Sequence, residues 1–132
     1  MPENESLALG EYIDDVMRAT LEGKMVWTAV NPSTYSFISG DRAGRFVLQR
    51  VDRMVKQVVH EGNLNLSKQV KEIGYVFQVF NLSTLGGNIQ PFVTIDSFEN
   101  PAMNPKLEAL MKVIEVDTSK RKLDFLRSMV PK

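Results

Sequence analysis

The fold depends on residues 45–61, whose sequence is RFVLQRVDRMVKQVVHE. The part that follows the turn residues ending at Gly44 is rich in β-branched and aromatic side chains, and it predicts a strand over about 45–53. A stripe of apolar residues at helical spacing also runs through the segment and stops at Gly62, which is suited to end a helix: Val47, Leu48, Val51, Met54, Val55, Val58 and Val59. We favour the strand, and the alternative is a helix at 45–61 between two β-hairpins.

The residues that follow this segment predict a loop and then two more strands. Residues 60–71 have no sustained period and indicate a loop. Residues 74–81 alternate in β-strand fashion with apolar side chains on both faces, which is typical of a central strand covered on both sides. Residues 89–97 predict another strand, placed at an edge or carrying a bulge because Pro91 cannot donate a ladder hydrogen bond. Aromatic side chains in the predicted strands are expected in the core: Trp27, Tyr35, Tyr75, Phe77, Phe80 and Phe92.

Before residues 45–61, the sequence predicts a helix and a hairpin. Residues 6–22 have the apolar period of an amphipathic helix, and Gly23 can end it. Residues 24–30 and 34–38 are rich in β-branched and aromatic residues, and Asn31 and Pro32 lie between them. Two short strands joined by so tight a connection predict a β-hairpin.

The C-terminal part predicts helix. Asn104 followed by Pro105 is a favourable helix start. Residues 117–119 offer a break and a second cap, so the segment forms either two helices or one continuous helix. The order of elements predicts the α+β class: an antiparallel sheet of about four to five strands with an N-terminal helix and one or two C-terminal helices packed on it, as a single domain over 1–132.

Composition excludes several classes of protein. The chain has 132 residues, with 16 basic and 16 acidic side chains. Because its net charge is zero, there is no overall electrostatic attraction to nucleic acid or anionic lipid. It contains no cysteine, which removes disulfides and thiol chemistry and suits a reducing compartment. Neither a secretory signal nor an apolar run of ~20 residues is apparent. We therefore expect a cytoplasmic protein with no membrane partner.

The reactive side chains offer little for catalysis. His60 is the single histidine, so histidine charge relays and multi-histidine metal sites are not expected within one chain. Asp14 and Asp15 are adjacent in a predicted helix and point in different directions, which does not suit a catalytic pair. We expect no catalytic residues, no metal site, no cofactor and no enzymatic activity.

The most basic stretch carries the candidate binding residues. Arg42, Arg45, Arg50 and Arg53 lie close together in sequence, and arginine suits bidentate contacts with phosphate or carboxylate. If the segment is a strand, Arg45 and Arg53 share a face and Arg50 points the other way. The arginines form either a solvated polar face or a site for an anionic metabolite or nucleotide. Nucleic acid is not expected, because no aromatic residues are interleaved with them.

Several elements together resemble those of small uncharacterised bacterial and phage proteins that combine a helix, an antiparallel meander and a closing helix. The elements are Leu21, Glu22, Gly23, Lys24 and Trp27 after a helix, Tyr35 in a short strand, the strands at 46–51 and 75–81, and a leucine-rich C-terminal helix. The resemblance implies an α+β fold and a bacterial or phage source. It supplies no catalytic residues.

The sequence favours a function carried by surfaces. We expect a non-enzymatic binding or assembly module that self-associates or binds a protein partner, an accessory or regulatory protein of a bacterium or phage. The hairpin-rich sheet should leave at least one edge able to pair with another chain. The alternative is a small-ligand binder that recognises an anionic metabolite or nucleotide through the arginines.

Overall fold

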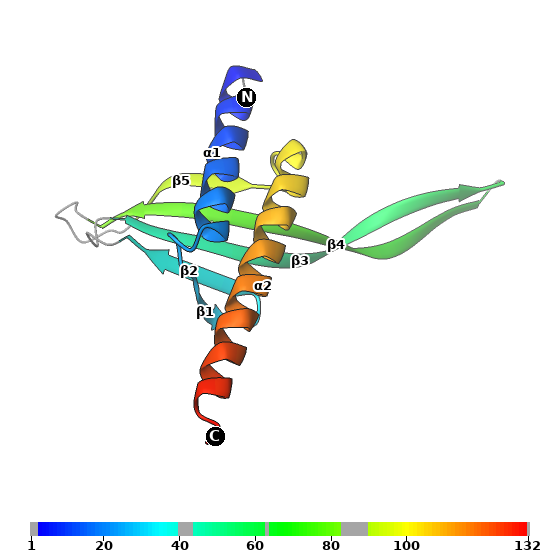
Figure 1. Ribbon diagram of the computed structural model, residues 1–132. Helices are drawn as coiled ribbons and strands as arrows, with labels where there is room; N and C mark the ends of the chain where they lie inside the picture. Colours follow the sequence, from blue (N-terminus) through cyan, green and yellow to red (C-terminus); the bar gives the residue numbers. More distant parts are fainter. Residues whose placement is uncertain (1–2, 40–43, 63, 83–89, 132) are drawn as a thin grey trace.

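A computed structural model describes residues 3–39, 44–62, 64–82 and 90–131, and the elements in these ranges form an α+β fold. Helix α1 precedes an antiparallel sheet in which each strand pairs with the next, in the order β1-β2-β3-β4-β5, and helix α2 closes the chain (Figure 1). The elements are α1 (Glu3–Leu21), β1 (Thr28–Asn31), β2 (Thr34–Ile38), β3 (Gly44–Glu61), β4 (Leu64–Asn81), β5 (Pro91–Asp96), the 3-10 turn η1 (Pro101–Met103) and α2 (Asn104–Ser128).

Residues 45–61, on which the fold depends, form a strand throughout their length. Strand β3 pairs with β4 without a register shift from Gly44, opposite Asn81, to Glu61, opposite Leu64. The strand predicted at 45–53 was therefore too short, and both the alternative helix at 45–61 and the loop at 60–71 were wrong. The reason is pairing: each strand supplies the other's backbone partners for 18 residues, although neither has a strong period alone. Gly62, at φ +61°, forms the hairpin turn instead of a helix end.

The shorter predicted elements are largely confirmed. Helix α1 ends at Leu21, and Gly23 has a positive φ of 77°, as expected of a residue that stops a helix. The strand predicted from residue 24 begins only at Thr28. Strand β5 lies at an edge of the sheet and its register shifts where Pro91 faces Phe80, as the proline predicted.

The C-terminal segment is one helix of 25 residues that begins at Asn104, with Pro105 in its first turn as predicted. The expected cap by Asn104 was wrong, because its side chain donates to the Ile73 carbonyl and the Ser97 hydroxyl, each at 3.3 Å. The break at 117–119 is absent, so of the two alternatives the continuous helix is correct. Asp117 does not cap a second helix, because its carboxylate accepts a 2.9 Å hydrogen bond from Arg121 one turn later.

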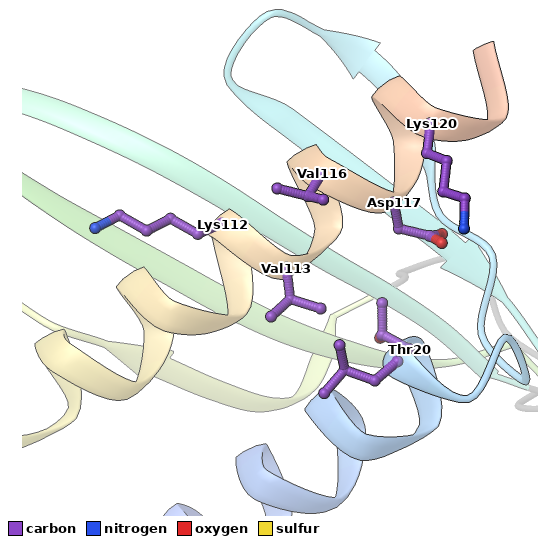
Figure 2. A pocket seen from close by; sticks show the side chains of 7 residues that line it. Thr20, Lys112, Val113, Val116, Asp117 and Lys120 are labelled. Carbon is purple, nitrogen blue, oxygen red and sulfur yellow. The ribbon is translucent and has the colours of Figure 1, made fainter. Parts of the chain in front are cut away.

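The two helices run parallel on the same face of the sheet (Figure 1). Near the start of α2, Lys106 Nζ lies 2.7 Å from the Asp14 carboxylate of α1. Further along, Val113 and Asp117 of α2 face the end of α1 at Thr20 (Figure 2). Helix α2 then continues past the last residue of α1.

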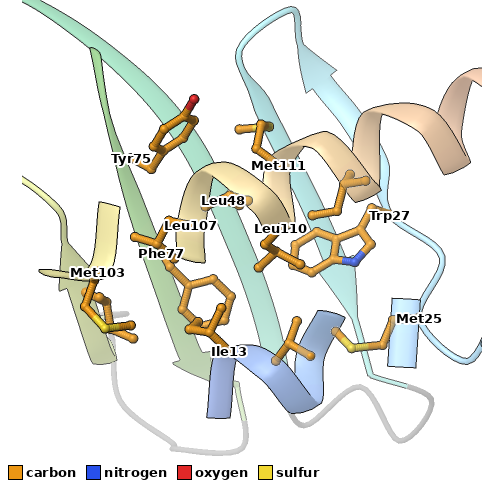
Figure 3. Packing of buried hydrophobic residues seen from close by; sticks show 13 residues of the cluster. Ile13, Met25, Trp27, Leu48, Tyr75, Phe77, Met103, Leu107, Leu110 and Met111 are labelled. Carbon is orange, nitrogen blue, oxygen red and sulfur yellow. The ribbon is translucent and has the colours of Figure 1, made fainter. Parts of the chain in front are cut away.

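The hydrophobic core lies between this pair of helices and the central strands (Figure 3). It contains Ile13, Val16, Met25, Trp27, Leu48, Tyr75, Phe77, Ile95, Met103, Leu107, Leu110, Met111 and Ile114. The buried Thr20 hydroxyl donates to the Val16 carbonyl at 2.9 Å and accepts from the Trp27 indole at 3.0 Å, which ties the link after α1 to the helix. Phe92, predicted in the core, is 77% exposed, because it is Val93 and Ile95 of strand β5 that pack on the core side of the sheet.

Candidate functional site

The long β3–β4 hairpin extends beyond the rest of the sheet. Strand β2 pairs with β3 only as far as Gln49, and β5 pairs with β4 only as far as Val76. Residues 53–61 and 64–72, here called the arm, therefore form a two-stranded ribbon that projects past the helices (Figure 1). Apart from the half-buried Val55 and Val70, every side chain described in the arm is exposed.

One face of the arm alternates apolar and polar cross-strand pairs. Val55 lies opposite Val70, and four residues further along Val59 lies opposite Leu66. Between and beside these apolar pairs lie polar pairs, Gln57 with Lys68 and Arg53 with Glu72. By strand alternation this face continues the side of the sheet that the helices leave uncovered.

The opposite face of the arm is more polar. Its apolar side chains, Met54 and Val58, each lie opposite a polar residue, Lys71 and Ser67. Near the tip, His60 Nδ1 is 2.6 Å from the Asn65 side-chain oxygen across the hairpin. His60 is solvent-exposed as expected, but it lies in a strand and not in a loop.

The candidate arginines do not converge. Arg45 and Arg53 share one face of β3 and Arg50 lies on the other, as the strand interpretation predicted. Arg45 lies opposite Phe80, at the end of β3 far from the arm tip, and Arg42 lies outside the described residues. The three described arginines therefore form no common anion site.

Arg50 belongs to a small network of charges on the helix-facing side of β3. The Asp52 carboxylate is 3.1 Å from Lys71 Nζ and 3.2 Å from Arg50 Nε. The hydrogen bond from Lys71, helped by Arg50, lowers the pKa of the Asp52 carboxyl. Arg50 is thus paired with a carboxylate of its own chain.

Arg53 is held at the base of the arm by an aromatic ring and a carboxylate. Its guanidinium carbon lies 3.9 Å from the centre of the Phe98 ring, and its Nη2 is 3.2 Å from Glu72. The Phe98 ring fits against Gly74, where a Cβ would approach the ring to 2.5 Å. An open hollow of about 380 Å³ adjoins these residues, but in the described part of the chain its charged groups already pair with each other.

A second apolar surface lies on the helical layer. Helices α1 and α2 enclose an open groove of about 310 Å³ lined by Thr20, Leu21, Lys112, Val113, Val116, Asp117 and Lys120 (Figure 2). From the end of the groove onward, every residue from 119 to 130, here called the overhang, is exposed, and Lys120 belongs to both the groove and the overhang. The overhang passes beyond the β1 edge of the sheet (Figure 1).

The adjacent acids of α1, Asp14 and Asp15, do not share a partner in the described chain. Asp14 pairs with Lys106 and Asp15 lies near Arg18, so the two neighbours have separate partners. No group of three or more histidine, aspartate or glutamate side chains in the described ranges could hold a metal ion. In the same ranges no helix is both long and apolar enough to cross a bilayer.

Sequence reasoning missed both the arm and the overhang. The signal for the arm was present in the valines at 51, 55 and 59, which lie on one face of a strand, but the same residues also fit a helix. The signal for the overhang was the apolar repeat of α2, which continues further than α1 can cover. Comparison with known protein families, curated proteins and solved structures found no match to this chain.

Proposed function

We propose that this protein is a non-enzymatic assembly module that self-associates through the arm. The observation that carries the proposal is the projecting two-stranded ribbon with its apolar cross-strand pairs, Val55–Val70 and Val59–Leu66. An isolated two-stranded hairpin is at best marginally stable in water, and it needs further strands or a packed face to be stable. A partner that covers this face of the arm would supply that packing.

A second copy of this chain fits the face of the arm. If two arms pack face to face about a two-fold axis that runs along them, β3 of one copy lies over β4 of the other. Val55 then lies over Val70 of the second copy, and Arg53 lies over Glu72 of the second copy. Apolar pairs meet apolar pairs and opposite charges meet, so the face is complementary to itself.

The proposal also includes a cytoplasmic location and a bacterial or phage source for the protein. A chain without cysteine suits the reducing cytoplasm, of a bacterium or of a cell that carries a phage. The alternative function, an anionic ligand held by the arginines, has less support. Arg50 and Arg53 are paired with Asp52 and Glu72, and Arg45 is distant from both in the register of β3.

Two adjacent valines provide a matched test. Val59 is on the face with the apolar pairs, and Val58 is on the opposite face and is the more exposed, at 56% against 38%. Light scattering after size exclusion should give twice the 14.9 kDa chain mass for the wild type. Val59→Asp should weaken association by about tenfold or more, because it places a charge in the apolar contact.

Val58→Asp adds the same charge to the same strand and should leave the mass unchanged. A wild type that stays monomeric at all concentrations would contradict the proposal. Equal loss of association in both valine variants would show that the face with the apolar pairs is not the contact.

A further inference from the structure

The outward side of α2 carries an apolar stripe that has no partner in the described chain. Val116, at the groove, is followed by Leu123 seven residues later and by Leu126 one turn further on, and the helix ends at Ser128. All three side chains are about half exposed or more. Apolar residues at spacings of seven and three match a second helix that winds around the first with a left-handed twist. The stripe therefore has the spacing of a helix-binding surface.

Basic side chains flank this stripe on both sides. In helical projection, Lys120 and Arg127 lie on one side of Leu123 and Lys122 lies on the other. None of these three cations has an ion-pair partner among the described residues, whereas Arg121 is paired with Asp117. Within the overhang, Asp124 is the single acid against four bases. Around Leu123 the charge is therefore complementary to an acidic ligand, whereas beside Val116 the exposed Glu115 takes the position that Lys122 has beside Leu123.

We propose that the groove and the overhang bind an acidic amphipathic α-helix of a partner protein. The apolar side of that helix packs on Val116 and Leu123 and enters the groove beside Leu21. Its carboxylates lie against Lys120, Lys122 and Arg127. This is recognition of a helix in a groove by apolar anchors, with register set by the flanking charges.

Two other occupants fit less well. In a second copy paired through the same stripe, Lys120, Lys122 and Arg127 would face their own counterparts, and like charges oppose such pairing. An anionic membrane would also meet the neighbouring helix α1, where Glu11, Asp14 and Asp15 are exposed and acidic. A flat lipid surface, moreover, cannot fill the groove between the two helices. An acidic helix contacts α2 along its length and meets neither objection.

The test uses two fluorescein-labelled peptides of three heptads with leucine at the a and d positions. One has glutamate at the flanking e and g positions, and the other has lysine there. Fluorescence anisotropy with the full chain should show the glutamate peptide binding at least about tenfold more tightly than the lysine peptide. That preference should fall as salt is added, because the flanking charges are exposed.

Variants of the overhang locate the site. Leu123→Asp should weaken binding of the glutamate peptide by about tenfold or more, and Lys120→Glu/Arg127→Glu should reverse the preference between the peptides. Phe125→Asp is the matched control, because Phe125 is exposed on the opposite side of the overhang and should be dispensable. Circular dichroism confirms that each variant keeps its helices.

The same variants distinguish the competing outcomes. Equal binding of the two peptides, or no effect of Leu123→Asp, would overturn the proposal. So would preferential binding to phosphatidylserine-containing vesicles that Leu123→Asp abolishes, or a dimer that Leu123→Asp dissociates. Val59→Asp in the arm should leave peptide binding intact, so this inference and the proposed self-association succeed or fail separately.

Discussion

Gly74 is the residue whose smallness the fold needs most clearly. A Cβ at this position would lie 2.5 Å from the Phe98 ring and 2.8 Å from the Ser97 hydroxyl. That hydroxyl accepts a hydrogen bond from the Tyr75 backbone nitrogen at 2.8 Å, so it is not free to move aside. Gly74→Ala should therefore lower the free energy of unfolding by about 1–3 kcal/mol, measured by urea denaturation.

Gly44 provides the control for this prediction. It also lies in the β3–β4 ladder, but a Cβ there would make only ordinary contacts, the nearest at 3.5 Å from the Ser39 hydroxyl. Gly44→Ala should be neutral or slightly stabilising, because alanine loses less conformational entropy than glycine on folding. If the two variants had equal stability, close packing at Gly74 would not be the reason for glycine there.

Tyr75 should make the free energy of unfolding depend on pH in the alkaline range. Burial against the helices raises the pKa of its hydroxyl above 10.0, and the nearby Glu108 raises this pKa further. Since the folded state favours the neutral phenol, the stability from this group is complete below pH ~10 and is lost as pH rises through the folded pKa. Phenolate absorbance should therefore appear at higher pH in the folded protein than in urea.

Tyr75→Phe isolates this contribution. The variant should lose less stability than the wild type between neutral pH and pH ~11, because it has no phenol to ionise at this position. Tyr12 and Tyr35, whose pKa values burial also raises, remain in the variant as an internal reference. An alkaline stability loss identical in both proteins would refute the assignment to Tyr75.

At the scale of elements, the two parts of the hairpin lie in different surroundings and should differ in local stability. Residues 45–51 and 74–80 lie within the sheet and beneath the helices, whereas the arm has exposed faces and free edges. In dilute protein, backbone amides of the arm should exchange with deuterium at least about 100-fold faster than those of the same strands within the sheet. At high concentration, self-association should slow exchange in the arm. Equal, concentration-independent protection along the whole hairpin would mean that the ribbon is stable alone.

At the scale of the whole molecule, helices and sheet share one core and should unfold together. Ile114 is fully buried in α2, so Ile114→Ala should cost about 2–5 kcal/mol of stability. Far-UV circular dichroism reports the helices, and Trp27 fluorescence reports the contact between the sheet and α1. The two transitions should coincide in the wild type and shift together in the variant.

The exposed Val116 provides the comparison on the same helix. Val116→Ala should change stability by no more than about 0.5 kcal/mol, because the side chain is 69% exposed. If Ile114→Ala shifted one spectroscopic transition and left the other in place, the helices and the sheet would be separate folding units.

The local pattern alone predicted the elements whose signals are short-range. Gly23 readily adopts a positive φ, Pro91 lacks a backbone donor and Pro105 has a fixed φ, and each lies at the helix boundary or sheet edge that it predicted. The alternation at 74–81 likewise identified a central strand, and the order of elements identified the α+β class. The expectation that this strand is covered on both sides was wrong, because both helices lie on the face of Tyr75 and Phe77.

Tertiary structure decided the length of the β3–β4 hairpin and the extent of the two exposed surfaces, the arm and the overhang. Whether the valines of 47–59 lie on a helix or a strand depends on the partner that takes their backbone hydrogen bonds, and that partner, β4, lies outside the segment that carries the valines. Arg50 and Arg53 likewise acquired Asp52, Glu72 and Phe98 as neighbours only through strand pairing and the return of the chain after β5. The apolar residues of the arm and the overhang have the composition of core residues. These residues are exposed because the neighbouring helices and strands end before they reach the arm or the overhang.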